Sequence, residues 1–367
     1  MARGAEQPLD PAVAVPAPRE NPDLVGHESA ERELRRLAET GRLPHAILLS
    51  GPRGIGKATL AFRFARFLLA KGAHTSAPAA ESGLEINPQS GVFHRVAAGG
   101  HADVLTVERT YDPRRRRLRG EIVVDDAREI ASFFRLTAAE EGWRIVIVDG
   151  AEEMNRSAAN ALLKVLEEPP QQALLLLVSH SPGRLLPTIR SRCRRFPLAP
   201  LACEALRQLL GSFRPELAPT EVEALAALAE GSIGRALVLA EAGGLALYRS
   251  LIEMLSQIPR LDAIRLHAFA DQLARADAED AYRVGQELLS QLLARVTASA
   301  ARRRLAGGEI IGGENEAIRR LAVRADAARW AASREEMERS FAATDELNLD
   351  RKQAILGVFF AIDELAR

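Results

Sequence analysis

A glycine-rich loop lies between a short apolar run and a helix-like segment of this chain. Residues 51–59 read Gly-Pro-Arg-Gly-Ile-Gly-Lys-Ala-Thr, and the apolar run Ala46–Ser50 precedes them. This order is typical of a P-loop, in which backbone N–H groups surround a phosphate and a lysine reaches its outer oxygens. The sequence therefore predicts a phosphate-binding loop with four key residues: Gly51, Gly54, Gly56 and Lys57.

One component of this loop is missing. The hydroxyl group that holds Mg²⁺ in a P-loop belongs at position 58, where this chain has alanine. Thr59 comes one residue late, and one residue on a helix rotates a side chain by about 100°. We therefore expect the scaffold of an ATPase with weak or no ATP hydrolysis. Whether ATP or ADP occupies the site, and whether Mg²⁺ accompanies it, stays open from sequence.

Acidic residues that could complete a nucleotide site follow a second apolar run. Asp149 comes directly after Ile145–Val148, whose four apolar residues without alternation are typical of a parallel strand covered on both faces. A carboxylate at this place commonly holds Mg²⁺. The glutamate that activates water would follow at once, but residue 150 is glycine, so Glu152 is the nearest substitute. The alternative for Glu152 is an acidic turn that caps the next helix.

Two arginines are candidates for contact with phosphate. Arg192 lies in a Ser-Arg-Cys motif at 191–193 and could reach the phosphates of a neighbouring subunit. Arginine suits that task because its planar guanidinium stays charged and grips two oxygens at once. Arg235 follows a glycine-bordered turn at 231–234 and could be directed at a phosphate from the start of a helix. For both residues a solvated surface arginine is the alternative.

The composition excludes several classes of protein. The 49 basic and 49 acidic residues cancel, so any contact with nucleic acid must be local. The candidates for such a contact are Arg114, Arg115, Arg116, Arg117 and Arg119, with a solvated loop as the alternative. Cys193 and Cys203 alone cannot form a zinc site or a disulfide framework, so we expect no zinc. The absence of a long apolar run and of a signal peptide favours a cytoplasmic location.

The pattern of elements divides the chain into four parts. Residues 1–20, rich in Ala and Pro, are predicted to be a disordered tail. Residues 21–200 alternate strand-like and helix-like segments, which predicts an α/β domain with a parallel sheet and helices on both faces. Within this part, the small and polar residues 71–100 are interpreted as a surface insertion. Strand patterns then disappear, and 201–245 and 246–367 are predicted to be two helical domains.

Taken together, these motifs resemble those of clamp-loader subunits in the AAA+ family. The resemblance implies that 201–245 is the helical lid domain and 246–367 the collar domain through which subunits assemble. Clamp loaders open a ring-shaped sliding clamp and place it on primed DNA, as part of the replicative DNA polymerase holoenzyme. The residues that carry the resemblance are 25–28, 43–46, 51–59, 145–149, 159–170, 191–193 and 348–353.

The resemblance also implies roles for individual residues. Arg192 matches the arginine finger that one subunit supplies to its neighbour's ATP, while Ser179 matches sensor 1 and Arg235 matches sensor 2. A subunit of this kind carries no polymerase activity and need not hydrolyse its own ATP. Its partners would be a tau/gamma-type motor subunit, a delta-type subunit, the sliding clamp and, through the complex, primed DNA. Family members commonly carry a four-cysteine zinc module after the P-loop helix, and residues 71–100 contain no cysteine.

Two other functions stay open from sequence alone. The chain could be an active AAA+ motor of the tau/gamma type, against which stand the alanine at position 58, the glycine at position 150 and the missing zinc module. It could also be a structural adaptor that keeps the fold and binds no nucleotide. The isolated motor would hydrolyse ATP, whereas the adaptor would not bind it.

Overall fold

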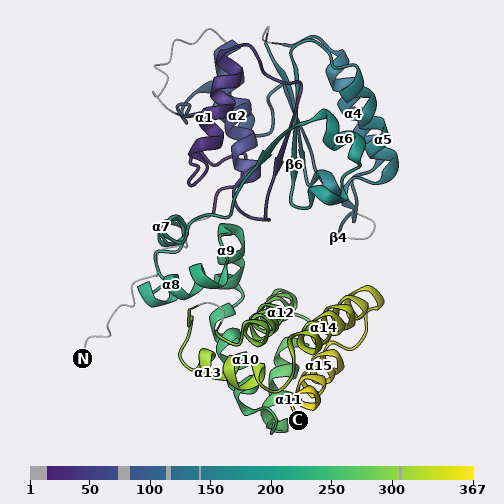
Figure 1. Cartoon of the computed structure of the whole chain (residues 1–367). Coiled ribbons are helices and arrows are strands. Elements are labelled where there is room, and N and C mark those ends of the chain that lie inside the picture. The colour runs from purple at the N-terminus through teal and green to yellow at the C-terminus, as the bar shows by residue number, and fades with distance from the viewer. Residues whose placement is uncertain (1–14, 73–82, 113–116, 140–141, 306–307) are drawn as a thin grey trace, which may run out of the picture. The chain divides into compact units, whose positions relative to one another are not determined.

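The computed structural model describes residues 15–72, 83–112, 117–139, 142–305 and 308–367 (Figure 1). They form two compact units. The first unit ends at Pro215 and also includes Gly231–Ile233, and the second consists of Glu216–Glu230 and Gly234–Arg367. The greater part of the predicted tail, residues 1–14, lies outside the described residues.

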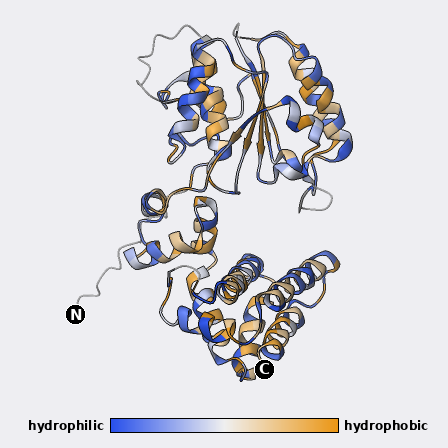
Figure 2. Cartoon of the chain, viewed as in Figure 1, coloured by the Kyte–Doolittle hydropathy of each residue, from blue (hydrophilic) through white to orange (hydrophobic). Residues whose placement is uncertain are grey.

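A five-stranded parallel sheet forms the centre of the first unit, in the order β2-β5-β6-β1-β7. The strands are β1 (Ala46–Ser50), β2 (Val104–Val107), β5 (Arg144–Asp149), β6 (Ala173–Ser179) and β7 (Arg194–Pro197). The central strands are buried on both faces, as their unbroken apolar runs predicted. Figure 2 shows these strands as the most apolar part of the unit, between helices with polar outer faces.

Helices cover both faces of this sheet (Figure 1). On one face, α1 (Glu28–Glu39) and α2 (Lys57–Gly72) bury their apolar sides against Ile47, Leu49, Ile145 and Leu176. The other face is covered by α4 (Val124–Arg135), α5 (Arg156–Glu167) and α6 (Pro187–Arg192). Strand residues alternate between the two clusters because successive side chains point to opposite faces. The prediction of a parallel sheet with helices on both sides is confirmed.

Part of the segment 71–100, which was interpreted as a surface insertion, forms a helix, and residues 73–82 lie outside the described residues. Residues Gly91–Ala97 form α3, which packs against α2. The Ser90 hydroxyl caps it by accepting a hydrogen bond from the N–H of Phe93 at 3.2 Å. Three apolar residues of α3 are buried: Val92, Phe93 and Val96. A helix of seven residues with so few apolar positions is too short for its period to stand out.

The basic run predicted to lie in a loop is partly a hairpin. Strands β3 (Tyr111–Asp112) and β4 (Arg117–Leu118) pair in antiparallel fashion, and the N–H of Arg119 donates to the carbonyl of Thr110. The remaining arginines of the run, at 114–116, lie outside the described residues. Contact of this run with DNA stays a prediction.

The described part of the second unit contains only helices, as predicted. They are α8 (Pro219–Leu228), α9 (Ile233–Glu241, from its second residue), α10 (Gly244–Gln257), α11 (Ala263–Leu273), α12 (Glu279–Arg302), α13 (Glu314–Ala322), α14 (Ala327–Leu347) and α15 (Arg351–Leu365). The long helix α12 packs against α10, α13 and α14. Helix α7 (Cys203–Phe213) belongs to the first unit, so the predicted lid and collar boundaries stay predictions. Across the described residues, every helix is too short or too polar to cross a bilayer.

Candidate phosphate-binding site

The glycine-rich loop runs from the end of β1 at Ser50 to the start of α2 at Lys57. Its glycines are required by its shape. A Cβ atom on Gly51 would lie 2.4 Å from the carbonyl oxygen of Leu198, and Gly54 has a φ angle of +75°. Side chains other than hydrogen would clash or strain the backbone at these places. The loop therefore has the tight turn and open backbone that a phosphate cradle needs, as predicted from its spacing.

Lys57 lies inside this loop. Its Nζ atom donates to the carbonyl oxygens of Gly51 at 2.8 Å and Pro52 at 2.5 Å, and the residue is only 4% exposed. Burial lowers the pKa of Lys57 to about 8, although the charges of Asp149 and Glu152 oppose that shift. A phosphate at the loop would offer this ammonium stronger acceptors than the two carbonyls. The loop and its lysine thus fit a phosphate group.

The carboxyl ends of three neighbouring strands bring the other predicted residues to the same edge. In the register of the sheet, Ser50 on β1 lies beside Ser179 on β6, and Asp149 on β5 lies beside Val178. Ser179 is fully buried. Burial raises the pKa of Asp149, while the nearby charges of His180 and Lys57 lower it. The P-loop, the aspartate predicted to hold Mg²⁺ and the predicted sensor-1 serine therefore share one end of the sheet.

Glu152 makes hydrogen bonds within the chain. Its Oε1 atom accepts from the backbone N–H of His180 at 3.0 Å and of Ser181 at 3.2 Å, and lies 3.3 Å from Nε2 of His180. Burial would raise the pKa of Glu152, but hydrogen bonds to the carboxylate, from its own backbone N–H and that of His180 among others, outweigh burial and hold the pKa low. The side chain thus ties the short helix at Ala151–Glu153 to the end of β6. A role in water activation stays a prediction.

The side chains around position 58 do not fit a P-loop magnesium site. Ala58 has no oxygen, and Thr59 is 8% exposed on the packed side of α2. Mg²⁺ requires near-ideal octahedral oxygen ligands, and its usual P-loop hydroxyl is lacking here. As for zinc, no cluster of three potential ligands occurs among the described residues, and the expectation of no zinc stays a prediction.

Arg192 is the last residue of α6, at the surface of the first unit. Its side chain is 37% exposed. The Nη2 atom donates to Oε1 of Glu167 on α5 at 3.0 Å, and Nη1 donates to the carbonyl of Thr188 at 3.1 Å. An exposed guanidinium at this place is accessible to a neighbouring molecule, as an arginine finger requires.

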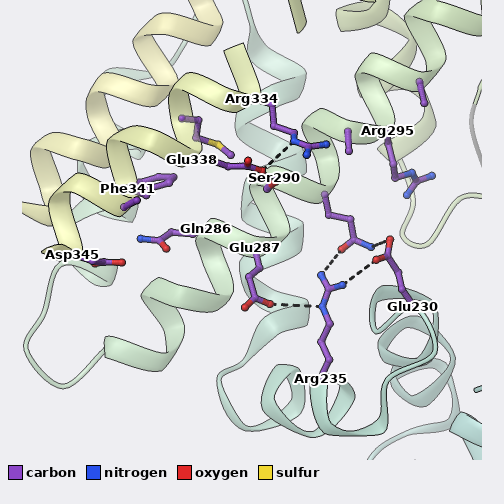
Figure 3. A pocket seen from close by; sticks show the side chains of 15 residues that line it. Glu230, Arg235, Gln286, Glu287, Ser290, Arg295, Arg334, Glu338, Phe341 and Asp345 are labelled. Atoms are coloured by element: carbon purple, nitrogen blue, oxygen red, sulfur yellow. Dashed lines mark hydrogen bonds and ion pairs between the residues drawn. The ribbon is translucent and has the colours of Figure 1, made fainter. Parts of the chain in front are cut away.

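Arg235 lies on α9 in the second unit, and its guanidinium has partners there (Figure 3). Nη1 donates to Oε2 of Glu230 at 3.1 Å, and Nη2 donates to Oε1 of Gln291 at 3.0 Å. Its Nε lies 3.8 Å from Oε2 of Glu287. These partners line an open groove of about 770 Å³ between α9, α12 and α14. Arg235 thus contacts side chains of its own unit, and its role as sensor 2 stays a prediction.

Residues 26–202 match the model of the protein family described as DNA polymerase III, delta subunit. The match covers a little less than half of the chain. A curated relative, DNA polymerase III subunit delta' of Pseudomonas aeruginosa, is 40% identical over 190 residues, or 51% of this chain and 53% of the relative. DNA polymerase III subunit tau of Escherichia coli is 31% identical over 226 residues, or 60% of this chain and 32% of the relative. The chain spans about half the length of the first relative and about a third of the second.

Among solved structures, a DNA polymerase III gamma subunit-related protein from Thermotoga maritima aligns over 91% of this chain and 99% of its own. Its sequence identity is 19% and its TM-score is 0.39. The resemblance to clamp-loader subunits, and to the delta' subunit among them, is confirmed by the sequence relatives.

The first unit also contains buried residues that sequence reasoning missed. Arg63 and Arg66, 3% and 1% exposed on α2, hold the segment before α1. Arg66 donates to the carbonyls of Arg19 and Asn21, at 2.8 and 2.7 Å, and Arg63 bonds the carbonyl of Pro22. His27 follows this segment, with Nε2 2.7 Å from the carbonyl of P-loop residue Ile55. The available signal was two arginines three residues apart in the otherwise apolar stretch 60–70.

Proposed function

We propose that this chain is a non-motor subunit of the clamp loader of a replicative DNA polymerase. It would supply Arg192 to ATP bound by a neighbouring motor subunit and help to place the sliding clamp on primed DNA. The observation that carries the proposal is a contrast, within the first unit, between an exposed arginine and an incomplete nucleotide site. Arg192 lies exposed at the end of α6, whereas the chain's own site has alanine at position 58 and glycine at position 150. The names of the relatives support the same role.

In its own site the chain would bind a nucleotide without cleaving it. Lys57 would exchange the carbonyls of Gly51 and Pro52 for phosphate oxygens, and the loop N–H groups would donate to the same phosphate. Asp149 is the one predicted carboxylate at the end of β5 that would face a metal ion in such a site. Without a hydroxyl at position 58, and with Glu152 bound to backbone N–H groups, the chain lacks the usual means to hold that ion and activate water.

We expect nucleotide binding by the isolated chain to weaken as the pH rises through 8. Lys57, with a pKa of about 8, is mostly charged at pH 7 and mostly neutral at pH 9. If binding needs the charged form, the affinity for ADP should fall about tenfold over this range. Isothermal titration calorimetry at pH 7, 8 and 9 measures this.

The matched controls for this prediction are K57A and K71A, since Lys71 is an exposed lysine of the same helix. K57A should bind ADP weakly at every pH, and K71A should behave as the unaltered chain. Equal affinity of the unaltered chain at pH 7 and 9 would contradict the prediction. No binding of ATP or ADP at any pH would instead favour the adaptor without nucleotide.

An active motor of the tau/gamma type is the second candidate function, because the P-loop turn and Lys57 are both retained. Such a motor would hydrolyse ATP on its own at ordinary motor rates and lose that activity in K57A. Our proposal expects no turnover above background in either protein.

Co-purification tests the proposed role as a whole. The full chain, expressed with a tau/gamma-type motor and a delta-type subunit of the same organism, should enter one stable complex with clamp-loading activity. Omission of the chain should abolish loading. If the two other subunits assemble and load the clamp equally well without it, the proposed function is wrong.

A further inference from the structure

We propose that Glu167 is the positioning residue for Arg192. This inference rests on the proposed function, because it concerns how the finger is presented to a neighbouring subunit. Glu167 would hold the guanidinium at one place on the surface, so that the remaining N–H groups face outward before a partner docks. It would act through Arg192 and would not itself touch the nucleotide.

The pair joins the ends of two packed helices. Glu167 is the last residue of α5 and Arg192 the last of α6, and these helices contact one another. Each helix is fixed by buried side chains, Leu162 and Leu166 on α5 and Ile189 on α6. The position of the carboxylate is therefore set by the core. A side chain held by a rigid element is placed more precisely than one held by a loop.

Two hydrogen bonds hold the Arg192 guanidinium. Nη2 donates to Glu167 at 3.0 Å and Nη1 to Thr188 at 3.1 Å, which leaves three of its five N–H donors for another acceptor. An arginine side chain loses rotamer entropy when it is immobilised. Prior fixation by Glu167 removes part of that loss from the step in which the finger meets phosphate.

The charge at this helix end also favours a role for the pair. A carboxylate at the C-terminus of a helix is repelled by the helix dipole, so Glu167 is unfavourable there without a cation. Arg192 supplies that cation from the end of α6, where a positive charge is itself favourable. The neighbouring Glu168 is exposed and forms no ion pair with any described residue, so it serves as a matched control.

The test compares E167A, E168A, R192A and R192A/E167A in the full complex with the motor subunit and primed DNA. Turnover is followed with radiolabelled ATP, so that slow rates are measurable. E167A should lower kcat by about two- to fivefold, the range for loss of one exposed ion pair, and leave KM for ATP unchanged. E168A should leave both unchanged. In the R192A background, E167A should cause no further loss, because Glu167 acts only through the arginine.

Three results would overturn the positioning role. One is an E167A rate equal to that of E168A, and another is an equal loss from E167A with or without Arg192, which indicates a general structural effect. The third is a higher rate in E167A, because the carboxylate would then mask the finger. If R192A itself turns over ATP normally, the proposed finger fails and the positioning role fails with it. If R192A is impaired and E167A is not, only the positioning role is wrong.

Discussion

Replacement of Arg192 by Ala is expected to lower the DNA-stimulated ATP turnover of the reconstituted complex by about 10³-fold or more. An arginine finger contributes roughly 10³–10⁵ in rate, because its charge stabilises the transferring phosphoryl group in the transition state. The loss should appear in kcat, whereas assembly of the complex should be unchanged. The measurement is steady-state ATP hydrolysis by the complete complex with clamp and primed DNA.

Arg194 provides the matched control for this experiment. It lies two residues further on, at the start of β7, with a side chain that is 58% exposed and 3.6 Å from Glu33. R194A should retain normal turnover if ATP hydrolysis depends on a positive charge at position 192 in particular, and not on any positive charge nearby. Stability should change little in either variant, since exposed ion pairs contribute about 0.2–1 kcal/mol. Unchanged turnover in R192A would show that the finger belongs to another subunit.

The sheet and the loop could be predicted because local sequence determines both. Strands β5 and β6 contain the short apolar runs 145–148 and 173–178, a pattern typical of a strand covered on both faces. The loop could be recognised because its turns require glycine at Gly51 and Gly54. Asp149 followed from the same reasoning, since the carboxyl ends of parallel strands share one edge of the sheet.

The contacts that occupy the site residues could not be predicted, because they join segments far apart in sequence. Glu152 was weighed as a water activator or a helix cap, and the structure gives it the backbone N–H groups of residues 180 and 181. Arg235 was weighed as a phosphate contact, and its guanidinium bonds Gln291, 56 residues further along the chain. Pairings of this kind depend on how helices pack, and an isolated polar residue in sequence gives no sign of its partner.

Replacement of Glu314 by Ala should destabilise the second unit by about 3–5 kcal/mol, the cost of breaking a buried ion pair on one side. Glu314 is fully buried at the start of α13. It accepts a hydrogen bond from the hydroxyl of Tyr248 at 2.5 Å, pairs with Arg295, and accepts from the N–H of Ile310 at 2.7 Å. Its removal leaves the Arg295 charge, 14% exposed, and a buried hydroxyl without their acceptor.

Trp330, fully buried on α14, reports on this unit by its fluorescence, and W143F removes the other tryptophan of the chain. Urea unfolding in that background should show an earlier transition for E314A. E316A is the matched control, since Glu316 lies two residues further along α13 in an exposed pair with Arg319. Its cost should stay below about 1 kcal/mol. Equal urea midpoints for E314A and E316A would contradict this prediction. Packing between the helices, and not the buried carboxylate, would then hold residues 308–314 against α12.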